Sequence, residues 1–509
     1  MPCLLTIDSG LTVTKAVVFN LDGTQRAVVR RNVPQLMPGP RHVTRDMDAL
    51  WHHTCDAIRA AIALAGVAPA EIIAVAATAH GDGVYLLDAD KRPLGPGILS
   101  LDSRAADLLA LWDKTTLPHD SLALTGQAPH VSAPATLLAW MKQHEPERFA
   151  RIAHILACKD WLRFCLTGTI GTDRTEASAS FTDVRTQAYA PGALALFGLS
   201  SLAHALPPVS APEAVFGAVT AQAAAQTGLA QGTPVAAGLH DVTASALGIG
   251  AHRAGVVGIV AGTYSINEVV SHAPRPDAAW LCRNAVAPGR WNNMAISPAS
   301  TTNYDWFLST LCADEIAAGA DIHALLAPEI AAALNRPSSL LYHPYLFGAP
   351  QGPLASAGFL GLRGWHTRGD MLAALLEGIA FNHRHHVDAL RARFPADSAV
   401  LTGGASRNPV VAQLFADILA LPVTVTATDE AAAWGAALCA GAAVGAFATF
   451  DADPRDLAAI STVYTPDPGR TAHYQTRYGV YCDTADRLAA TWGALETLAL
   501  MPRTGAAPG

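Results

Sequence analysis

Short runs of apolar, β-branched residues alternate along the chain with longer stretches rich in Ala and Leu. The runs at 4–8, 15–21 and 72–78 have the pattern of strands, and residues 48–66 have the pattern of a helix. Strands and helices in alternation are typical of α/β domains. The pair Asp22-Gly23, which separates two strand-like runs, predicts a β-hairpin.

The second half of the chain repeats this plan in a weaker form. Residues 254–270 (AGVVGIVAGTYSINEVV) have the pattern strand, glycine-hydroxyl turn, strand, and so do residues 7–19 (IDSGLTVTKAVVF). An internal repeat of this kind predicts two related domains. We place them at residues 1–248 and 249–500, and we expect the tail 501–509 to be disordered.

Composition narrows the class of protein. The chain has 509 residues, 51% of them apolar and 15% charged, which fits a large folded enzyme and excludes a disordered chain. Its formal net charge of −8 argues against a nucleic acid partner. Eight dispersed cysteines without a CxxC pair suit a reducing compartment, and strand-like sequence from Cys3 leaves no room for a signal peptide. We therefore expect a cytoplasmic protein.

One uncharged segment, Ala431–Ala448, is long enough to consider as a membrane span. Its residues are mostly Ala and Gly, which do not drive insertion as Leu, Ile and Val do. We predict a small-residue helix packed inside a domain, and no membrane partner.

The first strand ends in a polar cluster that fits a phosphate-binding hairpin. Gly10 permits a tight turn in which backbone N–H groups approach an anion. Thr12 and Thr14 offer hydroxyl donors, and Lys15 adds a positive charge. Asp8 is placed to hold Mg²⁺ through water, opposite a di- or triphosphate. The alternative is an ordinary hairpin whose polar residues face solvent.

Two segments of the second half have matching chemistry. Gly262 and Thr263 form an amide-and-hydroxyl turn at the position of the repeat, and two such turns facing each other would clamp one polyphosphate. Residues 400–423 have the pattern strand, glycine turn, helix, in which small residues leave space for adenine and the helix N-terminus suits a phosphate. The candidate nucleotide contacts here are Gly403, Gly404, Ala405 and Asn408. An unrelated hairpin and a tight strand-to-helix connection are the alternatives.

Group transfer to a hydroxyl needs a base, and Asp241 is the candidate. It follows a strand and precedes a small-residue helix, near the predicted domain boundary, where substrates bind in two-lobed enzymes. A helix-capping role would explain the same residue. His240 is a second candidate contact, with a packed or surface histidine as the alternative.

Together these elements resemble the FGGY family of carbohydrate kinases, over almost the whole chain from about Cys3 to about Ala490. DSGLTVTK is similar to the first phosphate hairpin of the family, GLHD to its catalytic loop, and AGTYS to its second phosphate hairpin. GGASRNPVVAQLFADILALPV is similar to the adenosine segment, and further matches include ILSLDSRA, CLTGTIGTDRTEAS and PYLFGAPQGPLASAGFLGL followed by EGIAFNHR. The motifs occur in the family's order.

The resemblance implies an α/β fold of two ribonuclease H-like (actin-like ATPase) domains with a central cleft. It implies ATP and Mg²⁺ as cofactors, with Asp241 as the general base that takes a proton from the attacking sugar hydroxyl. Asp8 would lie near the metal, and Thr12 and Lys15 would contact the transferred phosphoryl group. Gly262 and Thr263 would bind that group from the second domain, and Gly403, Gly404 and Asn408 would border the adenosine. One departure is Leu11, which stands where the family usually has a hydroxyl in the first hairpin.

The segment from residue 77 to 105 is expected to line the sugar pocket. His80 and Asp82, around Gly81, can each hydrogen-bond adjacent sugar hydroxyls. The pattern is closer to the kinases of L-xylulose and related keto-sugars than to D-xylulose kinases, and the sequence GDG is also similar to erythritol kinases. The alternative is that His80 and Asp82 only organise the loop. Asp102 and Arg104 are either sugar contacts or a structural ion pair.

We therefore predict a kinase that phosphorylates a ketopentose, in the first instance D- or L-xylulose. An erythritol or polyol kinase is the alternative. The rivals from other classes are a non-catalytic sugar sensor and a filament-forming protein on the same fold. The sensor would more readily lose Asp241, and the filament protein would not need the segment AHGDG. A homodimer is the commonest assembly of a soluble enzyme, but the sequence does not determine the oligomeric state of this one.

Overall fold

The computed structural model describes residues 1–352 and 354–500, with the backbone only at 499 and 500. Two compact units are present, each assembled from several segments of the chain. Unit 1 comprises Met1–Ala254, Val269–Met294 and Ala427–Ile460, and unit 2 comprises Gly255–Glu268, Ala295–Thr426 and the rest from Ser461. Two stretches from the second half of the chain thus belong to unit 1. The boundary near residue 249 stays a prediction, and the tail 501–509 lies outside the described residues.

Unit 1 is built on a seven-stranded sheet with the order β11, β12, β5, β1, β2 and β3, and with β13 beside β5. β1 and β13 run parallel to β5, whereas β2 is antiparallel to both β1 and β3. The hairpin predicted at Asp22-Gly23 joins β2 and β3 and is confirmed. The strand bounds are β1 Cys3–Ser9, β2 Val13–Asn20, β3 Gln25–Asn32, β5 Ile72–Ala79, β11 Val215–Ala218, β12 Pro234–Ala236 and β13 Leu239–His240.

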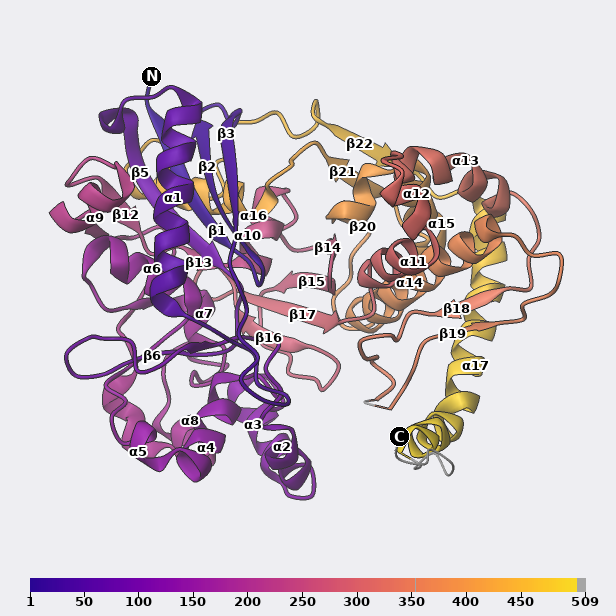
Figure 1. The fold of residues 1–509 in the computed structure, drawn as a ribbon, viewed down its shortest axis with the longest axis horizontal. Coiled ribbons are helices and arrows are strands. Elements are labelled where there is room, and N and C mark those ends of the chain that lie inside the picture. Colours follow the sequence, from indigo (N-terminus) through magenta and orange to yellow (C-terminus); the bar gives the residue numbers. More distant parts are fainter. Residues whose placement is uncertain (353, 501–509) are drawn as a thin grey trace, which may run out of the picture. The chain divides into compact units, whose positions relative to one another are not determined.

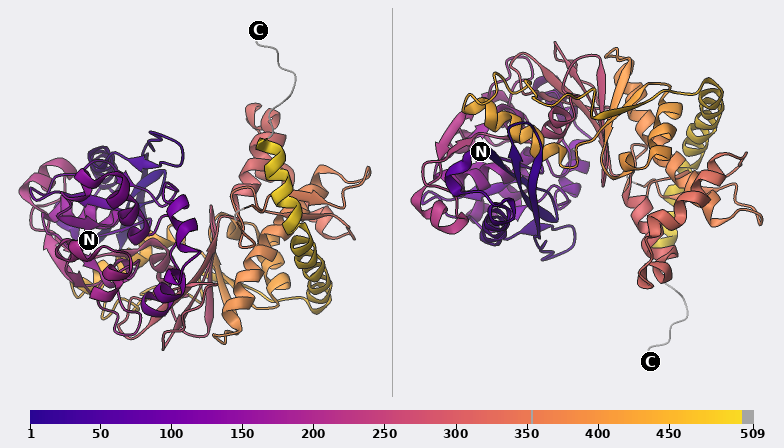
Figure 2. Two further views of the ribbon diagram at one scale, coloured as in Figure 1. Left: turned by 90° about the horizontal axis from the view of Figure 1, so that it is seen from below. Right: turned by 90° about the horizontal axis from the view of Figure 1, so that it is seen from above.

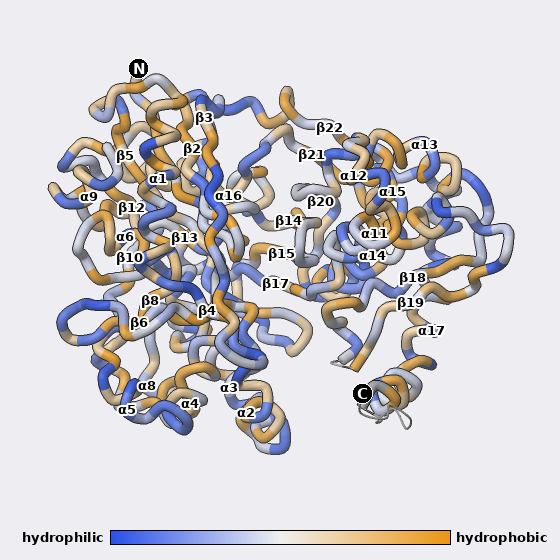
Figure 3. The backbone as a smooth tube through the Cα atoms, viewed as in Figure 1, coloured by the Kyte–Doolittle hydropathy of each residue, from blue (hydrophilic) through white to orange (hydrophobic). Residues whose placement is uncertain are grey.

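Helices cover both faces of this sheet (Figure 1). Because side chains alternate along a strand, Leu5 and Ile7 of β1 pack with α1, α6 and α9, whereas Leu4 packs with α10 and α16. In Figure 3, α1 carries apolar and polar stretches in turn, as expected of a helix with one buried face. The helix bounds are α1 Met47–Ala65, α6 Cys158–Thr167, α9 Ala221–Thr227, α10 Asp241–Gly248 and α16 Ala431–Ala443.

A further apolar cluster of unit 1, separate from those on the two faces of the sheet, lies among short helices and strands. It draws mainly on residues 84–108, 135–155 and 181–205. The bounds of these and the neighbouring elements are β4 Thr44–Arg45, η1 Pro69–Glu71, β6 Tyr85–Leu87, β7 Gly97–Ile98, α2 Ala106–Trp112, α3 Leu117–Thr125, α4 Pro134–His144, α5 Pro146–Phe149, β8 His154–Leu156, β9 Thr172–Asp173, α7 Arg174–Ala177, α8 Pro191–Leu196, η2 Ser200–Ala205, β10 Val209–Ser210, β16 Leu281–Asn284 and β17 Trp291–Ser297.

The small-residue helix predicted near residue 431 is α16, and its packing explains its composition. Its backbone and that of α10 approach so closely that a Cβ atom at Gly435 would lie 2.0 Å from the Ala244 carbonyl oxygen. A Cβ atom at Gly248 would lie equally close, 2.0 Å, to the Ala431 oxygen. Small residues are therefore required where the two helices cross. No helix among residues 1–352 and 354–500 is both long and apolar enough to cross a membrane.

We expect Gly435→Ala to lower the free energy of unfolding by about 2–3 kcal/mol, because overpacking here displaces backbone and not a flexible side chain. Urea unfolding followed by tryptophan fluorescence measures the change. Gly192→Ala in α8 is the matched control, because its new Cβ atom would make an ordinary 3.7 Å contact with Leu124. A Gly435→Ala variant as stable as the control would contradict this account of the helix pair.

Unit 2 contains a second sheet, in which β15, β14, β20, β21 and β22 are neighbours in that order. β14 is antiparallel to β15, as the sequence repeat predicts, and parallel to β20. The yellow helix α17 lies along the orange helices of this unit in every view (Figures 1 and 2). The bounds are β14 Val256–Ala261, β15 Ser265–Ser271, α11 Thr302–Leu311, α12 Ala313–Ala317, α13 Ile322–Leu334, β18 Leu341–His343, β19 Gly358–Leu360, α14 Arg368–Arg391, β20 Ser398–Thr402, η3 Gly404–Arg407, α15 Pro409–Leu419, β21 Val423–Thr426, β22 Ser461–Tyr464 and α17 Pro468–Leu500.

Candidate active site

Three neighbouring parallel strands of unit 1 end at one edge of the sheet, and each delivers a predicted site residue there. Asp8 is near the end of β1, His80 directly follows β5, and Asp241 directly follows β13. The backbone N–H of His80 donates to the Ser9 carbonyl oxygen over 3.0 Å, which ties two of these strand ends together. The carboxyl ends of parallel strands are where α/β proteins bind their ligands. The structure therefore brings these three residues to one edge.

Asp241 is the first residue of α10, and His240 occupies the capping position before it. Asp241 therefore lies one residue past the N-cap position, although its side chain still bonds within the first turn of the helix. Its Oδ1 accepts a hydrogen bond of 2.7 Å from the Val242 N–H. Burial raises the pKa of Asp241 to about 7, and the negative charge of Asp8 adds to this effect. A carboxyl with that pKa is suited to accept a proton near neutral pH.

His240 is buried, and its backbone N–H donates to the Thr175 hydroxyl over 3.0 Å. Its Nε2 lies 3.5 Å from Oδ1 of Asp241. Burial lowers the pKa of His240 to about 3, and the nearby positive charge of Arg283 lowers it further. The imidazole is thus neutral at pH 7 and can share hydrogen bonds without carrying charge.

In the first hairpin, strand alternation divides the predicted phosphate contacts between the two faces of the sheet. Gly10 closes the turn by donating its N–H to the Val13 carbonyl over 2.9 Å, and Thr12 is exposed at the tip. Thr14, in contrast, is buried, and its hydroxyl lies 3.3 Å from that of Thr54 in α1. The structure therefore places Thr14 in the packing beneath the hairpin and away from Lys15.

Lys15 points to the opposite face from Thr14 and forms two ion pairs within unit 1. Its Nζ lies 3.0 Å from Oδ2 of Asp8 and 2.9 Å from Oε2 of Glu430, at the start of α16. Burial alone would lower the pKa of Lys15, but these two carboxylates more than offset it, so the pKa is raised. Glu430 also accepts from Arg30 of β3. Sequence reasoning missed Glu430, which is 415 residues away from Lys15 in the chain.

The departure at Leu11 has a structural explanation. Its side chain packs against the core between the sheet and α1. Its carbonyl oxygen accepts from Gln35 over 2.9 Å and from the buried Arg45, which also donates to the Gly10 carbonyl over 3.2 Å. The turn is thus anchored by backbone contacts that do not require a hydroxyl at this position.

The loop after β5 brings the predicted sugar-binding residues together. His80 is buried, and its pKa is lowered to about 3 by burial first and by Arg45 second. Its Nε2 lies 3.3 Å from the Tyr85 hydroxyl. Gly81 contacts His240 so closely that a Cβ atom there would lie 2.1 Å from Nε2 of the imidazole. A side chain at position 81 would therefore displace the His240 imidazole from its place beside this loop.

Asp82 has the left-handed backbone conformation, with φ of 57°. Its Oδ1 accepts from Nη2 of Arg283 over 2.7 Å, and its Oδ2 lies 3.2 Å from Nε2 of His130. Burial, the largest single effect, would raise the pKa of Asp82, but Arg283, His130 and His240 together outweigh it and keep the pKa below its usual range. Arg283 in turn donates from Nε to Gln127 over 3.0 Å. Sequence reasoning missed Arg283, His130 and Gln127.

Asp102 and Arg104 form a buried, bidentate ion pair, with contacts of 2.9 Å and 2.8 Å. Oδ2 of Asp102 also accepts from the Val43 N–H over 2.7 Å. Of the two interpretations, the ion pair is confirmed. Because the partners satisfy each other, this pair has a structural explanation that does not require a sugar.

In unit 2 the predicted nucleotide residues also meet at strand ends, here those of β14 and β20. The Gly262 carbonyl accepts from the Thr301 hydroxyl over 2.6 Å, and Thr263 is exposed at the tip of the turn. Gly403 has φ of 96°, and a Cβ atom there would lie 2.4 Å from the Ala261 carbonyl oxygen. Only glycine fits this approach of the two segments.

After Gly403 the chain forms the short helix η3, which contains Gly404 and Ala405. A Cβ atom at Gly404 would meet no described atom within 4 Å, so open space adjoins it. Asn408 caps α15 by accepting from the Val410 N–H over 2.9 Å. Its side-chain oxygen is thus already engaged in capping the helix.

Comparisons with known proteins identify the family of the chain. Residues 3–248 match the N-terminal domain of the FGGY family of carbohydrate kinases, and residues 257–444 match the C-terminal domain. The chain is 33% identical to L-xylulose/3-keto-L-gulonate kinase of Escherichia coli over 94% of this chain and 95% of that protein. It is 30% identical to erythritol kinase of Brucella abortus, over 97% and 98% of the two chains.

Among solved structures, xylulose kinase from Rhodospirillum rubrum is similar, with a TM-score of 0.84 and 29% identity over 96% of this chain and all of the other. The chain therefore belongs to the FGGY family of carbohydrate kinases. It has the two-domain, ribonuclease H-like fold of actin-like ATPases, and it is a sugar kinase. Because the matched family and the similar curated proteins are sugar kinases, the interpretations as a sensor or a filament protein are set aside. Kinases of this family use ATP.

Proposed function

We propose that the protein transfers the γ-phosphoryl group of Mg²⁺-ATP to a hydroxyl of a ketopentose, L-xylulose in the first place, with Asp241 as the general base. The observation that carries this proposal is the carboxyl of Asp241 at the end of β13, with its pKa raised to about 7 by burial. Phosphoryl transfer requires a positioned hydroxyl and charge-stabilising donors, and little covalent chemistry from the protein.

The sugar is held by the loop of His80 and Asp82 beside His240, in the same unit as the base. Asp82 is an ionised acceptor, and the two histidines are neutral at pH 7. A site that pairs hydroxyls with buried acceptors rejects analogues lacking those hydroxyls. Arg283 and His130 keep the Asp82 carboxylate in place for this role.

The nucleotide contacts are proposed separately for each unit. In unit 1, Asp8, Gly10, Thr12 and Lys15 are close to the transferred phosphoryl group. In unit 2, the turn of Gly262 and Thr263 binds phosphate, and Gly403, Gly404, Ala405 and Asn408 border the adenosine. The open space at Gly404 and the exposed tip at Thr263 support these assignments.

The residues around Asp8 fit Mg²⁺. Asp8 supplies a hard carboxylate oxygen, and its negative charge raises the pKa of Asp241, an effect that a bound cation would reduce. Mg²⁺ is usually held by one or two carboxylates together with substrate phosphates and water, so no larger protein cage is needed. When bound, the ion would neutralise charge on the transferred phosphoryl group.

L-Xylulose is preferred over D-xylulose and erythritol for two reasons. The L-xylulose/3-keto-L-gulonate kinase of E. coli has higher identity to this chain than the erythritol kinase has. The sugar loop carries Asp82 where D-xylulose kinases typically have histidine. Erythritol or another polyol is the alternative within the same chemistry. A cytoplasmic location and a homodimer stay predictions.

The proposal is tested by following ADP release, with a coupled assay, from Mg²⁺-ATP and L-xylulose. Turnover should require the sugar, ATP and Mg²⁺ together, and addition of EDTA should abolish it. ADP release at the same rate without any sugar, or in the presence of EDTA, would contradict the proposal.

The pKa of Asp241 predicts a pH profile. A carboxyl must be ionised to act as a base, so activity falls as the pH drops below its raised pKa. We expect kcat/KM, measured with both substrates below KM, to rise about tenfold per pH unit below about 7 and to level off above. Enzyme returned from each pH to pH 8 should recover full activity, which excludes unfolding. A flat profile from about pH 5.5 to 8 would contradict the assignment.

A further inference from the structure

Four charged side chains are buried together inside unit 1, next to the segment that leads to Asp241. Nζ of Lys159 lies 2.6 Å from Oδ1 of Asp160 and 2.9 Å from Oδ1 of Asp173. Nη2 of Arg163 lies 3.5 Å from the same oxygen of Asp160. Two cations and two carboxylates thus compensate one another away from solvent. We call these four residues the buried ion cluster.

Stability alone is a weak explanation for the buried ion cluster. Taking charges out of water is costly, and well-packed apolar residues of similar volume are often at least as stabilising. Burial by itself would lower the pKa of Lys159, but Asp160 and Asp173 more than offset it, so the pKa is raised and the amine keeps its charge. The cluster is better explained by the groups that its carboxylates hold in place.

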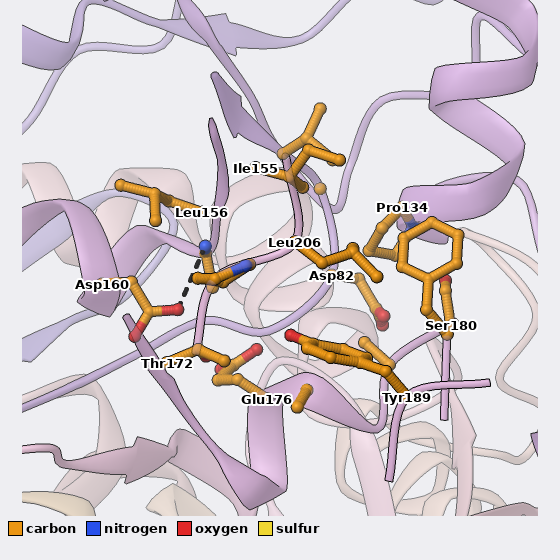
Figure 4. A pocket seen from close by; sticks show the side chains of 17 residues that line it. Asp82, Pro134, Ile155, Leu156, Asp160, Thr172, Glu176, Ser180, Tyr189 and Leu206 are labelled. Carbon is orange, nitrogen blue, oxygen red and sulfur yellow. Dashed lines mark hydrogen bonds between the residues drawn. The ribbon is translucent and has the colours of Figure 1, made fainter. Parts of the chain in front are cut away.

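Each carboxylate of the cluster organises the start of a helix. Oδ2 of Asp160 accepts from the Ala157 N–H, at the start of α6, over 3.3 Å (Figure 4). Asp173 caps α7, and its Oδ2 accepts both the N–H and the hydroxyl of Thr175 over 2.7 Å each. Because the Thr175 hydroxyl donates its hydrogen to Asp173, its lone pairs are left to accept from another group.

That other group is the backbone N–H of His240, which donates to the Thr175 hydroxyl over 3.0 Å. His240 directly precedes Asp241, the first residue of α10. It ends β13, a strand of only two residues that pairs with β5. So short a strand offers few backbone hydrogen bonds, so the bond to Thr175 is a large part of what fixes the start of α10.

The buried ion cluster also contacts the other end of the same segment. The Ala237 carbonyl oxygen lies 3.5 Å from Nζ of Lys159 and 3.5 Å from Nη1 of Arg163. Lys159 and the Thr175 hydroxyl meet at one carboxylate, that of Asp173. The cluster and the hydroxyl therefore hold one backbone segment, residues 237–240, at both of its ends.

We propose that Thr175 is a positioning residue for the base of the reaction, and that Asp173 and Lys159 keep its hydroxyl in the required orientation. Through the backbone of His240, Thr175 sets the place at which the Asp241 carboxylate meets the attacking hydroxyl. It needs no contact with the substrate in this role. The inference rests on the proposed function, because it takes Asp241 as the base.

The first test removes the Thr175 hydroxyl. Thr175→Val keeps the branched shape of the side chain, and Thr175→Ala removes the hydroxyl without adding bulk. We expect each to lower the single-turnover rate of phosphoryl transfer, measured by rapid quench with Mg²⁺-ATP and saturating L-xylulose, about tenfold, because small misplacements of a reacting group are costly. Thr175→Ser, which keeps the hydroxyl, should stay within about threefold of wild type. Rates of Thr175→Val and Thr175→Ala within about twofold of wild type would overturn the proposal.

The matched control is Thr227→Val, at the end of α9. Thr227 is buried as well, and its hydroxyl also donates to an oxygen and accepts a backbone N–H. Its partners are the Ala223 carbonyl at 2.7 Å and the Leu229 N–H at 3.2 Å. We expect this variant to keep the wild-type rate. A loss as large as that of Thr175→Val would show that removal of any buried hydroxyl lowers activity, and would overturn the proposal.

The second test determines whether Thr175 acts through Asp241. The single-turnover rates of wild type, Thr175→Val, Asp241→Asn and the double variant are compared. A positioning residue loses its effect once the base is gone, so we expect the double variant within about twofold of Asp241→Asn alone. A further loss of about tenfold in the double variant would show a structural role and overturn the proposal. A near-native rate of Asp241→Asn would instead contradict the proposed base, so the two failures are distinguishable.

Discussion

The variant Asp241→Asn is expected to lose phosphoryl transfer while it still binds sugar. Asparagine has nearly the same shape and keeps an oxygen that can accept the Val242 N–H, so the start of α10 is preserved. What it loses is the ability to take a proton from the attacking hydroxyl. Positioned general bases contribute about 10²- to 10⁴-fold to rate, and we expect kcat to fall within that range.

Two measurements separate chemistry from binding in this variant. Coupled ADP release gives kcat, and isothermal titration calorimetry gives the Kd of L-xylulose, which should stay within about threefold of wild type. The matched control is Asp113→Asn, at an exposed residue at the end of α2, which should retain full activity. Near-native turnover of Asp241→Asn would show that the base is another group.

The variant Arg283→Met is expected to have the largest effect on stability. Arg283 is 3% exposed and is an ion-pair partner of the partly buried Asp82 carboxylate at 2.7 Å. Removing one partner of a buried pair leaves an uncompensated charge and typically costs about 3–5 kcal/mol. His130 alone, 3.2 Å from the other carboxylate oxygen, does not replace that charge. Urea unfolding should show the loss, and kcat/KM for the sugar should fall with it.

A double variant tests the cause of that loss. In Asp82→Asn combined with Arg283→Met the uncompensated charge is absent, so at least half of the lost stability should return. Arg59→Met, which breaks an exposed pair with Asp56 on α1, is the control and should cost less than about 1 kcal/mol. If the double variant were as unstable as Arg283→Met, the damage would come from lost packing and not from charge.

Local sequence patterns were sufficient to predict the elements that position the site. The hairpins after Asp8 and Ala261, the strand before Asp241 and the small-residue helix α16 all depend on residues close together in the chain. Turn glycines and apolar alternation encode such features directly. The structure brings Asp8, His80 and Asp241 together because each lies at the end of one of three neighbouring parallel strands, a juxtaposition that the sequence patterns did not predict.

The residues missed by the sequence reasoning share a different origin. Arg283 is 201 residues from Asp82, and Glu430 is 415 residues from Lys15, so no local pattern links the partners. Their roles arise only when distant segments fold into unit 1. Thr14 is a prediction that the structure corrects. Its polar neighbours in the sequence suggested a phosphate contact, but strand alternation directs its side chain toward α1. Thr14 and Lys15 are consecutive residues of one strand, so alternation by itself places their side chains on opposite faces of the sheet.

The most direct test of the central claim is a competition experiment. Wild-type enzyme is given Mg²⁺-ATP and an equimolar mixture of L-xylulose, D-xylulose and erythritol, and each sugar phosphate is quantified by chromatography and mass spectrometry. The early product ratio equals the ratio of kcat/KM values and so reports specificity without separate kinetics. We predict that L-xylulose phosphate dominates. A dominant erythritol phosphate, or no phosphorylated product from any of the three, would contradict the account.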